Sequence, residues 1–269
     1  MLTVPEFVEQ QRALGRRIHA HDGVFWEEAA PGYSRPAFVY LPFERGSARP
    51  ALRHRWLGYS HQVPDAAQSN RTLPVMALER PALDGFGLAS LPQKKRNRVR
   101  RALKHCEIRR IEELDPWLEQ MRAINISQSE RQALKAGAPV SVRRYVDEAD
   151  DWRAQIRREF ALAEREWWGA FVEGELLAYL RSYQVESVRI IQQTKAHTGA
   201  FAHNAVDGLN YAVLEHAAAD PVCRRIIRGE ALHASLNQYK EQFLFQVVEL
   251  PYYTSRLWLQ NLARRWLKR

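Results

Sequence analysis

The chain has 269 residues, of which 40 are Lys or Arg and 31 are Asp or Glu, so its formal net charge is +9. Apolar residues make up 46% and charged residues 26%, which is typical of a folded globular protein and excludes a disordered or fibrous chain. No apolar run reaches the roughly 18 residues of a membrane-spanning helix, and residues 1–17 do not have the pattern of a secretory signal. Two cysteines, Cys106 and Cys223, cannot form a disulfide framework, so we expect a reducing, cytoplasmic setting.

Residues 1–92 contain nine of the 13 prolines, and short apolar runs separate them. This pattern predicts short strands joined by turns. The expected strands are 23–28, 37–41, 55–60 and 73–78. Before them, Phe7, Leu14 and Ile18 predict a helix over 6–18.

The composition changes at Pro92, after which helical patterns extend to about residue 166. The first expected helix carries a buried stripe at spacings of three and four, formed by Val99, Ala102, Leu103 and Cys106. A second helix is expected around Leu114, Leu118, Met121 and Ile124. A third, polar helix is expected over 142–165, with Trp152, Ile156 and Phe160 on its apolar side.

From residue 166 the pattern predicts three strands, with Glu173-Gly174 as the tight turn between the first two. A helix over 205–219 follows, with Asn204 as N-cap and Asp207 three residues later. Its buried face is expected to be Val206, Leu209, Val213 and Ala217. The rest of the chain predicts a strand at 224–228, a helix capped by Ser235, a strand at 245–250 and a basic amphipathic helix over 255–269.

This element order resembles that of the GNAT acyltransferase superfamily, and most of all its FemA/FemB/FemX-like branch. Three segments carry the resemblance, LPQKKRNRVRRALKHCEIRRI at 91–111, FAHNAVDGLNYAVLEHA at 201–217 and LNQYKEQFLF at 236–245. It implies an α+β fold with a GNAT-like mixed sheet flanked by helices. The domains expected are a proline-rich, partly degenerate N-terminal GNAT-like lobe (1–92), a GNAT-like acyltransferase domain (93–254) and the C-terminal helix (255–269).

The resemblance implies transfer of an acyl or aminoacyl group from an activated donor to an amine acceptor. Acyl-CoA is the donor across the superfamily, and aminoacyl-tRNA can be the donor in Fem-like members. Neither donor is a permanently bound cofactor. The glycine pair of the family's pyrophosphate loop is missing from QTKAHTGAFAHNAVDG at 193–208, where Gly199 stands alone until Gly208. We therefore expect weak or absent acetyl-CoA binding.

Three residues are candidate catalytic groups, namely His203 as a base, Glu230 as half of an acid/base pair with His233, and Tyr239 as a general acid. Four more are candidates for substrate binding, namely Lys240, Asn237, Asn204 and Asp207. Each also has a purely structural interpretation. Asn204 suits an N-cap, Tyr239 a core ring and Lys240 a surface position.

The run that follows Pro92 holds seven cations in eleven residues, and its candidate anion-binding members are Lys94, Lys95, Arg98 and Arg101. It predicts a helix face that binds phosphates, for instance those of tRNA. The alternative is an ordinary solvated helix face. The C-terminal helix, in which leucines and Trp266 accompany basic residues, suggests association with a membrane surface.

No cysteine–histidine spacing typical of a metal site occurs, and hydrolase, P-loop and zincin motifs are missing. We expect no metal. The sequence thus leaves two functions open. One is an acyl- or aminoacyltransferase that acts on an amine acceptor, and the other is an inert GNAT-like protein that binds an anionic polymer or a partner enzyme.

Overall fold

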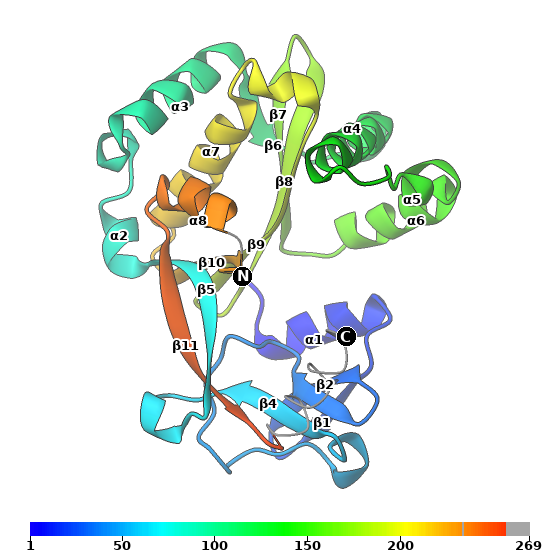
Figure 1. Ribbon diagram of the computed structural model, residues 1–269, viewed down its shortest axis with the longest axis vertical. Helices are drawn as coiled ribbons and strands as arrows, with labels where there is room; N and C mark the ends of the chain where they lie inside the picture. Colours follow the sequence, from blue (N-terminus) through cyan, green and yellow to red (C-terminus); the bar gives the residue numbers. More distant parts are fainter. Residues whose placement is uncertain (233, 257–269) are drawn as a thin grey trace. The chain divides into compact units, whose positions relative to one another are not determined.

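The computed structural model describes residues 1–232 and 234–256 and shows a mixed α+β fold (Figure 1). The helices in these residues are α1 (Val4–Ala13), α2 (Arg80–Asp84), α3 (Gln93–His105), α4 (Leu118–Ala136), α5 (Arg143–Val146), α6 (Ala149–Phe160), α7 (Ala205–Ala219) and α8 (Ala234–Glu241). The strands are β1 (Ile18–His21), β2 (Val24–Ala30), β3 (Tyr33–Pro36), β4 (Gly58–Gln62), β5 (Arg71–Glu79), β6 (Glu107–Arg110), β7 (Arg165–Val172), β8 (Glu175–Val185), β9 (Val188–Ala196), β10 (Arg225–Glu230) and β11 (Gln246–Thr254). The expected α+β class is confirmed.

Internal contacts divide the chain into two compact units. Unit 1 is residues 76–246 together with Met1, and unit 2 is residues 2–75 together with the described residues from 247 to 256. Strand pairing follows the order β1-β2-β3-β4-β11-β5-β10-β9-β8-β7-β6. The expected domain boundaries at residues 92 and 254 stay a prediction.

The sheet of unit 1 contains both antiparallel and parallel strand pairs. Strands β6 to β9 pair antiparallel in chain order, and β10 then joins β9 in parallel. The β7–β8 turn is at Glu173 and Gly174, whose φ angles of 52° and 83° are those of a type I′ hairpin turn. The β9–β10 ladder has three residue pairs, the last of them Ile190 with Ile227. Both strands continue past this pair without further pairing to each other, so their carboxyl ends separate. The candidate site lies where they separate.

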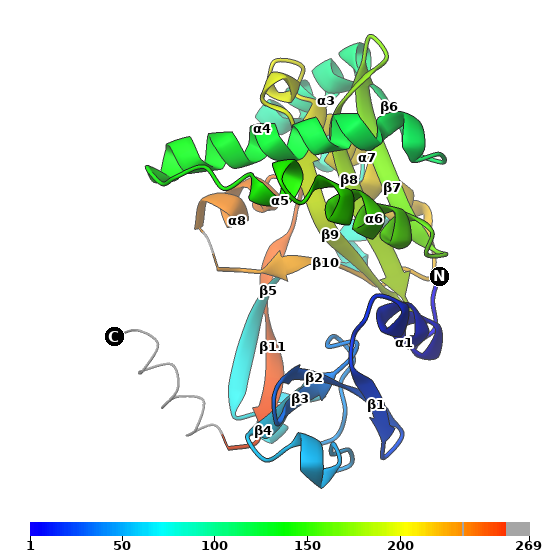
Figure 2. The same cartoon turned by 90° about the vertical axis from the view of Figure 1, so that its right-hand side faces the viewer.

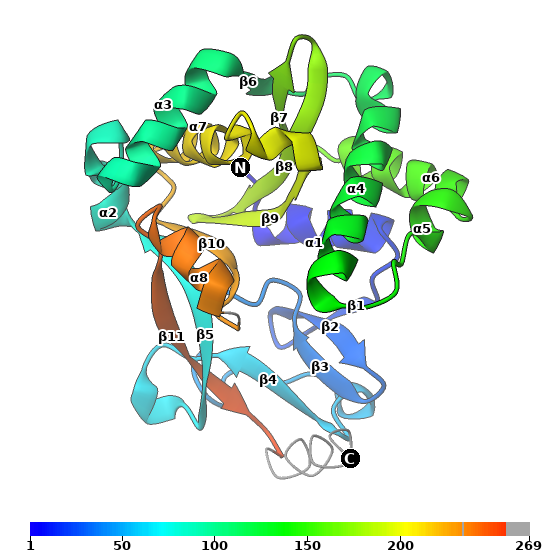
Figure 3. The ribbon, with the colours of Figure 1, turned by 45° about the horizontal axis from the view of Figure 1, so that its top comes forward.

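Helices cover both faces of this sheet (Figures 2 and 3). Helices α3 and α7 pack together on one face, over Ala178 and Leu180 of β8. Helices α4 and α6 cover the other face, where Trp167 and Tyr179 are buried. Trp167 and Trp168 lie in these different clusters, as expected for neighbours in a strand.

The expected core of α7 is confirmed at Leu209, Val213 and Ala217, which are fully buried, whereas Val206 is only partly buried. The expected stripe of α3 is wrong at one position, since Leu103 is 43% exposed. The buried stripe is instead Lys95, Val99, Ala102 and Cys106. The third expected helix is split, because residues 147 and 148 separate α5 from α6.

Unit 2 contains α1 and the strands β1-β2-β3-β4-β11. Thr3 and Glu6 form a capping box at the start of α1. The helix ends at Ala13, before Gly15 with its φ of 85°, so the expected extension to residue 18 is wrong. Residues 37–41 form bends and turns rather than the expected strand, and β3 takes that place beside β2.

In the part of the chain that the structure describes, no helix is long and apolar enough to cross a membrane. Residues 257–269, on which the expected C-terminal helix depends, lie outside the described residues.

Candidate functional site: a buried ionic cluster where two strands separate

A lysine and a carboxylate from different helices form a buried ion pair in unit 1. Lys95 Nζ of α3 lies 2.7 Å from Asp207 Oδ1 in the first turn of α7, and their side chains are 0% and 8% exposed. Burial is the largest influence on the pKa of Lys95 and lowers it, while Asp207 acts in the opposite direction. This interaction also places a neutral pair, rather than a lone anion, at the N-terminus of α7.

Tyr239 of α8 completes the cluster. Its hydroxyl donates to Asp207 Oδ1 at 2.9 Å and accepts from Asn210 Nδ2 at 3.2 Å. The ammonium of Lys95 lies 4.3 Å from the centre of the Tyr239 ring and 4.7 Å from that of Phe243. Burial and the neighbouring Asp207 raise the pKa of Tyr239 far above its usual value. The hydroxyl therefore keeps its proton and uses it to hold Asp207.

Arg228 connects this cluster to the separating strands. It lies on β10 just past the last β9–β10 pair, and its Nη2 donates to Thr194 Oγ1 of β9 at 3.3 Å. Its guanidinium carbon is 5.7 Å from the centre of the Tyr239 ring. Within the described residues, Arg228 Nη1 and Asn237 Oδ1 are buried without a hydrogen-bond partner. Because buried polar atoms are normally hydrogen-bonded, these two atoms are candidates to bond polar groups of a substrate.

Lys240 lies at the same end of β10. Its Nζ donates to the carbonyl oxygen of Arg228 at 2.7 Å. Burial, and then the charge of Arg228, lower the pKa of this half-buried lysine. It is thus a positioned ammonium group at the carboxyl end of the strand.

The loop between β9 and α7, where GNAT-type proteins bind pyrophosphate, uses its backbone donors internally. The N–H of Thr198 donates to Ser127 Oγ at 3.0 Å, and that of Gly199 donates to His197 Nδ1 at 3.1 Å. The N–H groups of Ala200, Ala202 and Asn204 donate to carbonyl oxygens of the same loop. These five donors are not available to an anion.

Arg131 of α4 holds this loop from outside. Its Nη1 donates to Thr198 Oγ1 at 3.2 Å and to the carbonyl of Ala196 at 3.3 Å. Its guanidinium carbon lies 4.7 Å from the centre of the Phe201 ring. Arg131 and Ser127 were not predictable as site residues, because their partner loop is about 70 residues away along the chain.

The expected anion-binding residues divide into two groups. Lys94, Arg98 and Arg101 are exposed on α3, as expected. The prediction for Lys95 is wrong, because its side chain points into the core and binds Asp207. Arg96 of the same run also has a structural role, since its guanidinium donates to the carbonyls of Ala89 and Leu91.

The expected residues around α7 and β10 lie in different surroundings. Asn204 is at the N-cap position, but its φ is 54° and its side chain makes no capping hydrogen bond, so the predicted side-chain cap is wrong. His203 is half-buried, and its ring makes no hydrogen bond or ion pair to a described residue. Glu230 is exposed at the end of β10, and its expected partner His233 lies outside the described residues.

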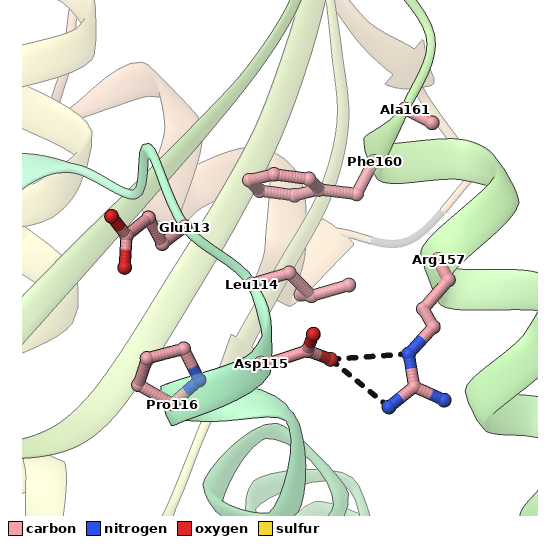
Figure 4. Close-up of a pocket in the computed structure, with 7 residues that line it drawn as sticks. All are labelled: Glu113, Leu114, Asp115, Pro116, Arg157, Phe160 and Ala161. Atoms are coloured by element: carbon pink, nitrogen blue, oxygen red, sulfur yellow. Dashed lines mark hydrogen bonds and ion pairs between the residues drawn. The ribbon is translucent and has the colours of Figure 1, made fainter.

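A separate open pocket of about 430 Å³ lies between the start of α4 and the end of α6 (Figure 4). Its lining includes Asp115 and Arg157, which pair at 2.9 Å, and Phe160. It contains none of the expected site residues, and its Asp115 and Arg157 already pair with each other. Among the described residues, no group of three or more His, Cys, Asp or Glu side chains is arranged to hold a metal ion.

No protein-family model and no curated protein sequence matches the chain. Solved structures do match it over nearly its whole length. FemX has a TM-score of 0.61 at 10% identity, with 93% of this chain and 90% of FemX covered. L-PGS from Bacillus licheniformis has a TM-score of 0.60 at 12% identity, with 99% of this chain and 96% of that chain covered. A conserved protein of unknown function from Bacteroides thetaiotaomicron has a TM-score of 0.60 at 13% identity, over 94% and 89% of the two chains. The chain thus has the GNAT-like fold seen in FemX and L-PGS, and the resemblance inferred from the sequence is confirmed at the level of the fold.

Proposed function

We propose that this protein transfers an aminoacyl group from an aminoacyl-tRNA to an amine acceptor. The observation that carries the proposal is the loop at 197–204, where five backbone N–H groups are occupied by Ser127, His197 and the loop's own carbonyls. Such a loop does not offer the cradle of N–H groups that a CoA pyrophosphate needs. The FemX-like fold supports a donor of the other kind, an ester of tRNA.

The reaction requires no covalent enzyme intermediate. The acceptor nitrogen attacks the ester carbonyl, a C–N bond forms, and the C–O bond to the terminal ribose breaks. The nitrogen loses one proton, and the ribose oxygen gains one as it leaves as a hydroxyl. The protein must therefore stabilise the developing oxyanion and relay a proton.

Lys240 suits the stabilising role. Its ammonium is anchored to the carbonyl of Arg228 at the end of β10, close to where β9 and β10 separate. A fixed positive charge in a half-buried position favours negative charge that develops on the carbonyl or on the leaving oxygen. The chain also has an extra residue in β9, Gln192, between the residues paired with Arg181 and Ser182. The backbone at such a bulge is an additional candidate donor.

Tyr239 is better suited to positioning than to acid catalysis, because its hydroxyl is committed to Asp207. Asp207, Asn210 and Lys95 hold this tyrosine in place beside Arg228. We retain Glu230 and His203 as candidates for the base, and Asn237 as a group that orients the substrate. Arg228 and Thr194 join them as binding residues that sequence reasoning missed.

The exposed face of α3 supplies contacts to the donor. Lys94, Arg98 and Arg101 are exposed, and their spacing places them on neighbouring surface of the helix. We propose that they bind tRNA phosphates. Changing all three to Gln lowers tRNA affinity and flattens its salt dependence by about one unit of slope per lost contact.

Two finer features stay proposals. One is that the proline-rich N-terminal region is a reduced GNAT-like lobe. The other is that the basic C-terminal segment, residues 255–269, associates with a membrane surface, which would bring the enzyme to a lipid-linked acceptor.

The decisive experiment compares donors at equal concentration. Purified protein is mixed with a panel of radiolabelled aminoacyl-tRNAs or with labelled acetyl-CoA, together with small amines and amino-terminated acceptors. We expect amide product from an aminoacyl-tRNA and none from acetyl-CoA. Lys240→Gln should lower the rate at saturating donor, whereas Lys135→Gln, an exposed lysine on α4, should not.

Two results would contradict the proposal. Product from acetyl-CoA with low micromolar affinity would show that the occupied loop opens to admit CoA. Tight tRNA binding without transfer to any acceptor would favour the second function, an inert GNAT-like protein that binds an anionic polymer.

A further inference from the structure

A second polar cluster lies on the opposite face of β8 and β9 from α3 and α7. Lys195 of β9 pairs directly with Tyr179 of β8, and Arg181 pairs with Gln193 two rows further along, on the same face. Directly paired residues share a face of the sheet, so Lys195 and Arg181 are diagonal neighbours on the face that contains Trp167 and Tyr179. The guanidinium carbon of Arg181 lies 4.9 Å from the centre of the Trp167 ring.

A chain of hydrogen bonds fixes Arg181 in this position. Its guanidinium pairs with Glu159 of α6 and also donates to Gln193 Oε1. Glu159 accepts from Gln155 Nε2 at 2.7 Å, and Gln155 accepts from Arg144 of α5 at 2.5 Å. The side chains of Arg181 and Glu159 are only 11% and 13% exposed. The inner members of the network are thus shielded from solvent, whereas Arg144 at its outer end is exposed.

The charges of this network do not balance. Glu159 is its carboxylate, and Arg181 already pairs with it. Lys195 contacts no carboxylate among the described residues, and burial lowers its pKa, followed by the charges of Arg181 and Arg144. Arg181 Nε is also buried without a hydrogen-bond partner in the described chain. A half-buried ammonium without a carboxylate partner, on a residue diagonal to an arginine with an unused N–H donor, is suited to binding an anion.

We propose that Lys195, with Arg181 and Arg144, binds an anionic group of the acceptor, a carboxylate or a phosphate. The acceptor is then an amine that also carries a negative charge, an inference that rests on the proposed aminoacyl transfer. It assigns a substrate class that neither the fold nor the comparisons provide.

The position of Lys195 in β9 fits this arrangement. Thr194 bonds to Arg228 across the gap between the two strands, on the side of the ionic cluster. Lys195 is the next residue, and successive residues of a strand face opposite sides of the sheet. The acceptor's anion would be held on the face of α4 to α6, while its amine reaches the donor carbonyl at the edge where β10 leaves β9.

The test measures anion binding without tRNA, by reaction of lysines with an amine-acylating reagent followed by peptide mass spectrometry. The pH is kept below the pKa of Lys195. The arms are inorganic phosphate, acetate and chloride at equal ionic strength. A bound anion that raises the pKa by one unit lowers the neutral fraction, and so the labelling rate, about tenfold. We expect slower labelling of Lys195 with phosphate or acetate but not with chloride, and no change at Lys135. Equal labelling of Lys195 in all three arms would overturn the proposal.

Variants separate this proposal from the proposed function. In thermal unfolding, phosphate should raise the Tm of the wild-type protein and of Lys195→Arg, but raise that of Lys195→Gln clearly less. In the transfer assay, Lys195→Gln should raise the KM for an anionic acceptor and leave the KM for its uncharged analogue unchanged. An equal phosphate effect on Lys195→Gln and wild type would overturn the anion site even if transfer is observed. Protection by phosphate in a protein that shows no transfer would leave the anion site standing while the proposed function fails.

Discussion

The two polar clusters of unit 1 are built from the same kinds of residue and differ in charge balance. In the cluster on the side of α3 and α7, Lys95 faces Asp207, and Tyr239 and Asn210 supply further hydrogen bonds. In the cluster on the side of α4 to α6, Arg181 forms an ion pair with Glu159, and Lys195 has no carboxylate partner in the described chain.

This difference separates a closed arrangement from an open one. A buried lysine and carboxylate that bond to each other fix the positions of their helices, and removing one member leaves the other uncompensated. A cluster with an unused positive charge is less stable alone and gains stability when an anion arrives. Burial of Lys95 therefore accompanies a paired charge, whereas burial of Lys195 accompanies an unpaired one. The variants below test this contrast.

The largest effect is expected for Lys95→Met. The change leaves Asp207 buried without its cation, so we expect a loss of about 3–5 kcal/mol in the free energy of unfolding. Urea denaturation measures it, and Lys94→Met, one residue away but exposed, should stay within about 0.5 kcal/mol of wild type. Adding Asp207→Leu to Lys95→Met should recover much of the loss. A small loss of unfolding free energy for Lys95→Met alone would show that the buried Asp207 does not depend on Lys95 for compensation of its charge.

Removing the tyrosine hydroxyl should have the next largest effect. Tyr239→Phe deletes a hydrogen bond to a buried carboxylate, for which we expect a loss of about 1.5–3 kcal/mol. Tyr211→Phe is the matched control, because Tyr211 donates to the exposed Glu215 at 2.6 Å, and it should cost less than about 1 kcal/mol. Similar losses for the two variants would argue against a special role for the buried cluster.

A smaller effect, dependent on added anion, is expected for Glu159→Gln. Arg181 loses its carboxylate, so the unfolding free energy should fall by about 1–3 kcal/mol. Phosphate should restore more stability to this variant than to wild type, because the excess positive charge has grown. Glu119→Gln serves as the control, since Glu119 pairs with Arg153 and Arg122 on the surface and should be indifferent to phosphate.

The smallest effect is a pH slope. The pKa of Lys195 is lowered below its ordinary value of 10.5, so between the two values the unfolded chain binds more protons than the folded one. In that window the contribution of Lys195 makes stability rise with pH. The slope of unfolding free energy against pH should therefore be more positive for wild type than for Lys195→Gln. Coincident slopes would mean that Lys195 titrates normally.

The sequence alone predicted much of the fold because its signals are local. The core positions of α7 and the Glu173-Gly174 turn depend on a period of 3.6 or on two adjacent residues. In the N-terminal region, strands four to seven residues long give little periodicity, and prolines occur both in β3 and just after the bends that follow it.

The candidate site was only partly predictable because its contacts are distant along the chain. Lys95 pairs with a residue 112 positions away, and Arg131 with one 67 positions away. One local signal was present, since Lys95 precedes Val99 by four residues and so lies on the buried stripe of α3. The density of charge around it favoured an exposed face, and only Asp207 explains why a lysine is stable inside.

The order of the two units along the chain has a consequence for synthesis of the protein. Unit 1 is one continuous stretch, 76–246 apart from Met1, and it interrupts unit 2. On the ribosome, residues 2–75 emerge first, but β4 gains its partner β11 only when residues 252–254 have been made. Until then the nascent chain presents an open strand edge, the kind of surface that pairs with other chains and attracts chaperones. Truncation just before β11 should therefore release a chain with a finished unit 1 and a permanently unfinished unit 2.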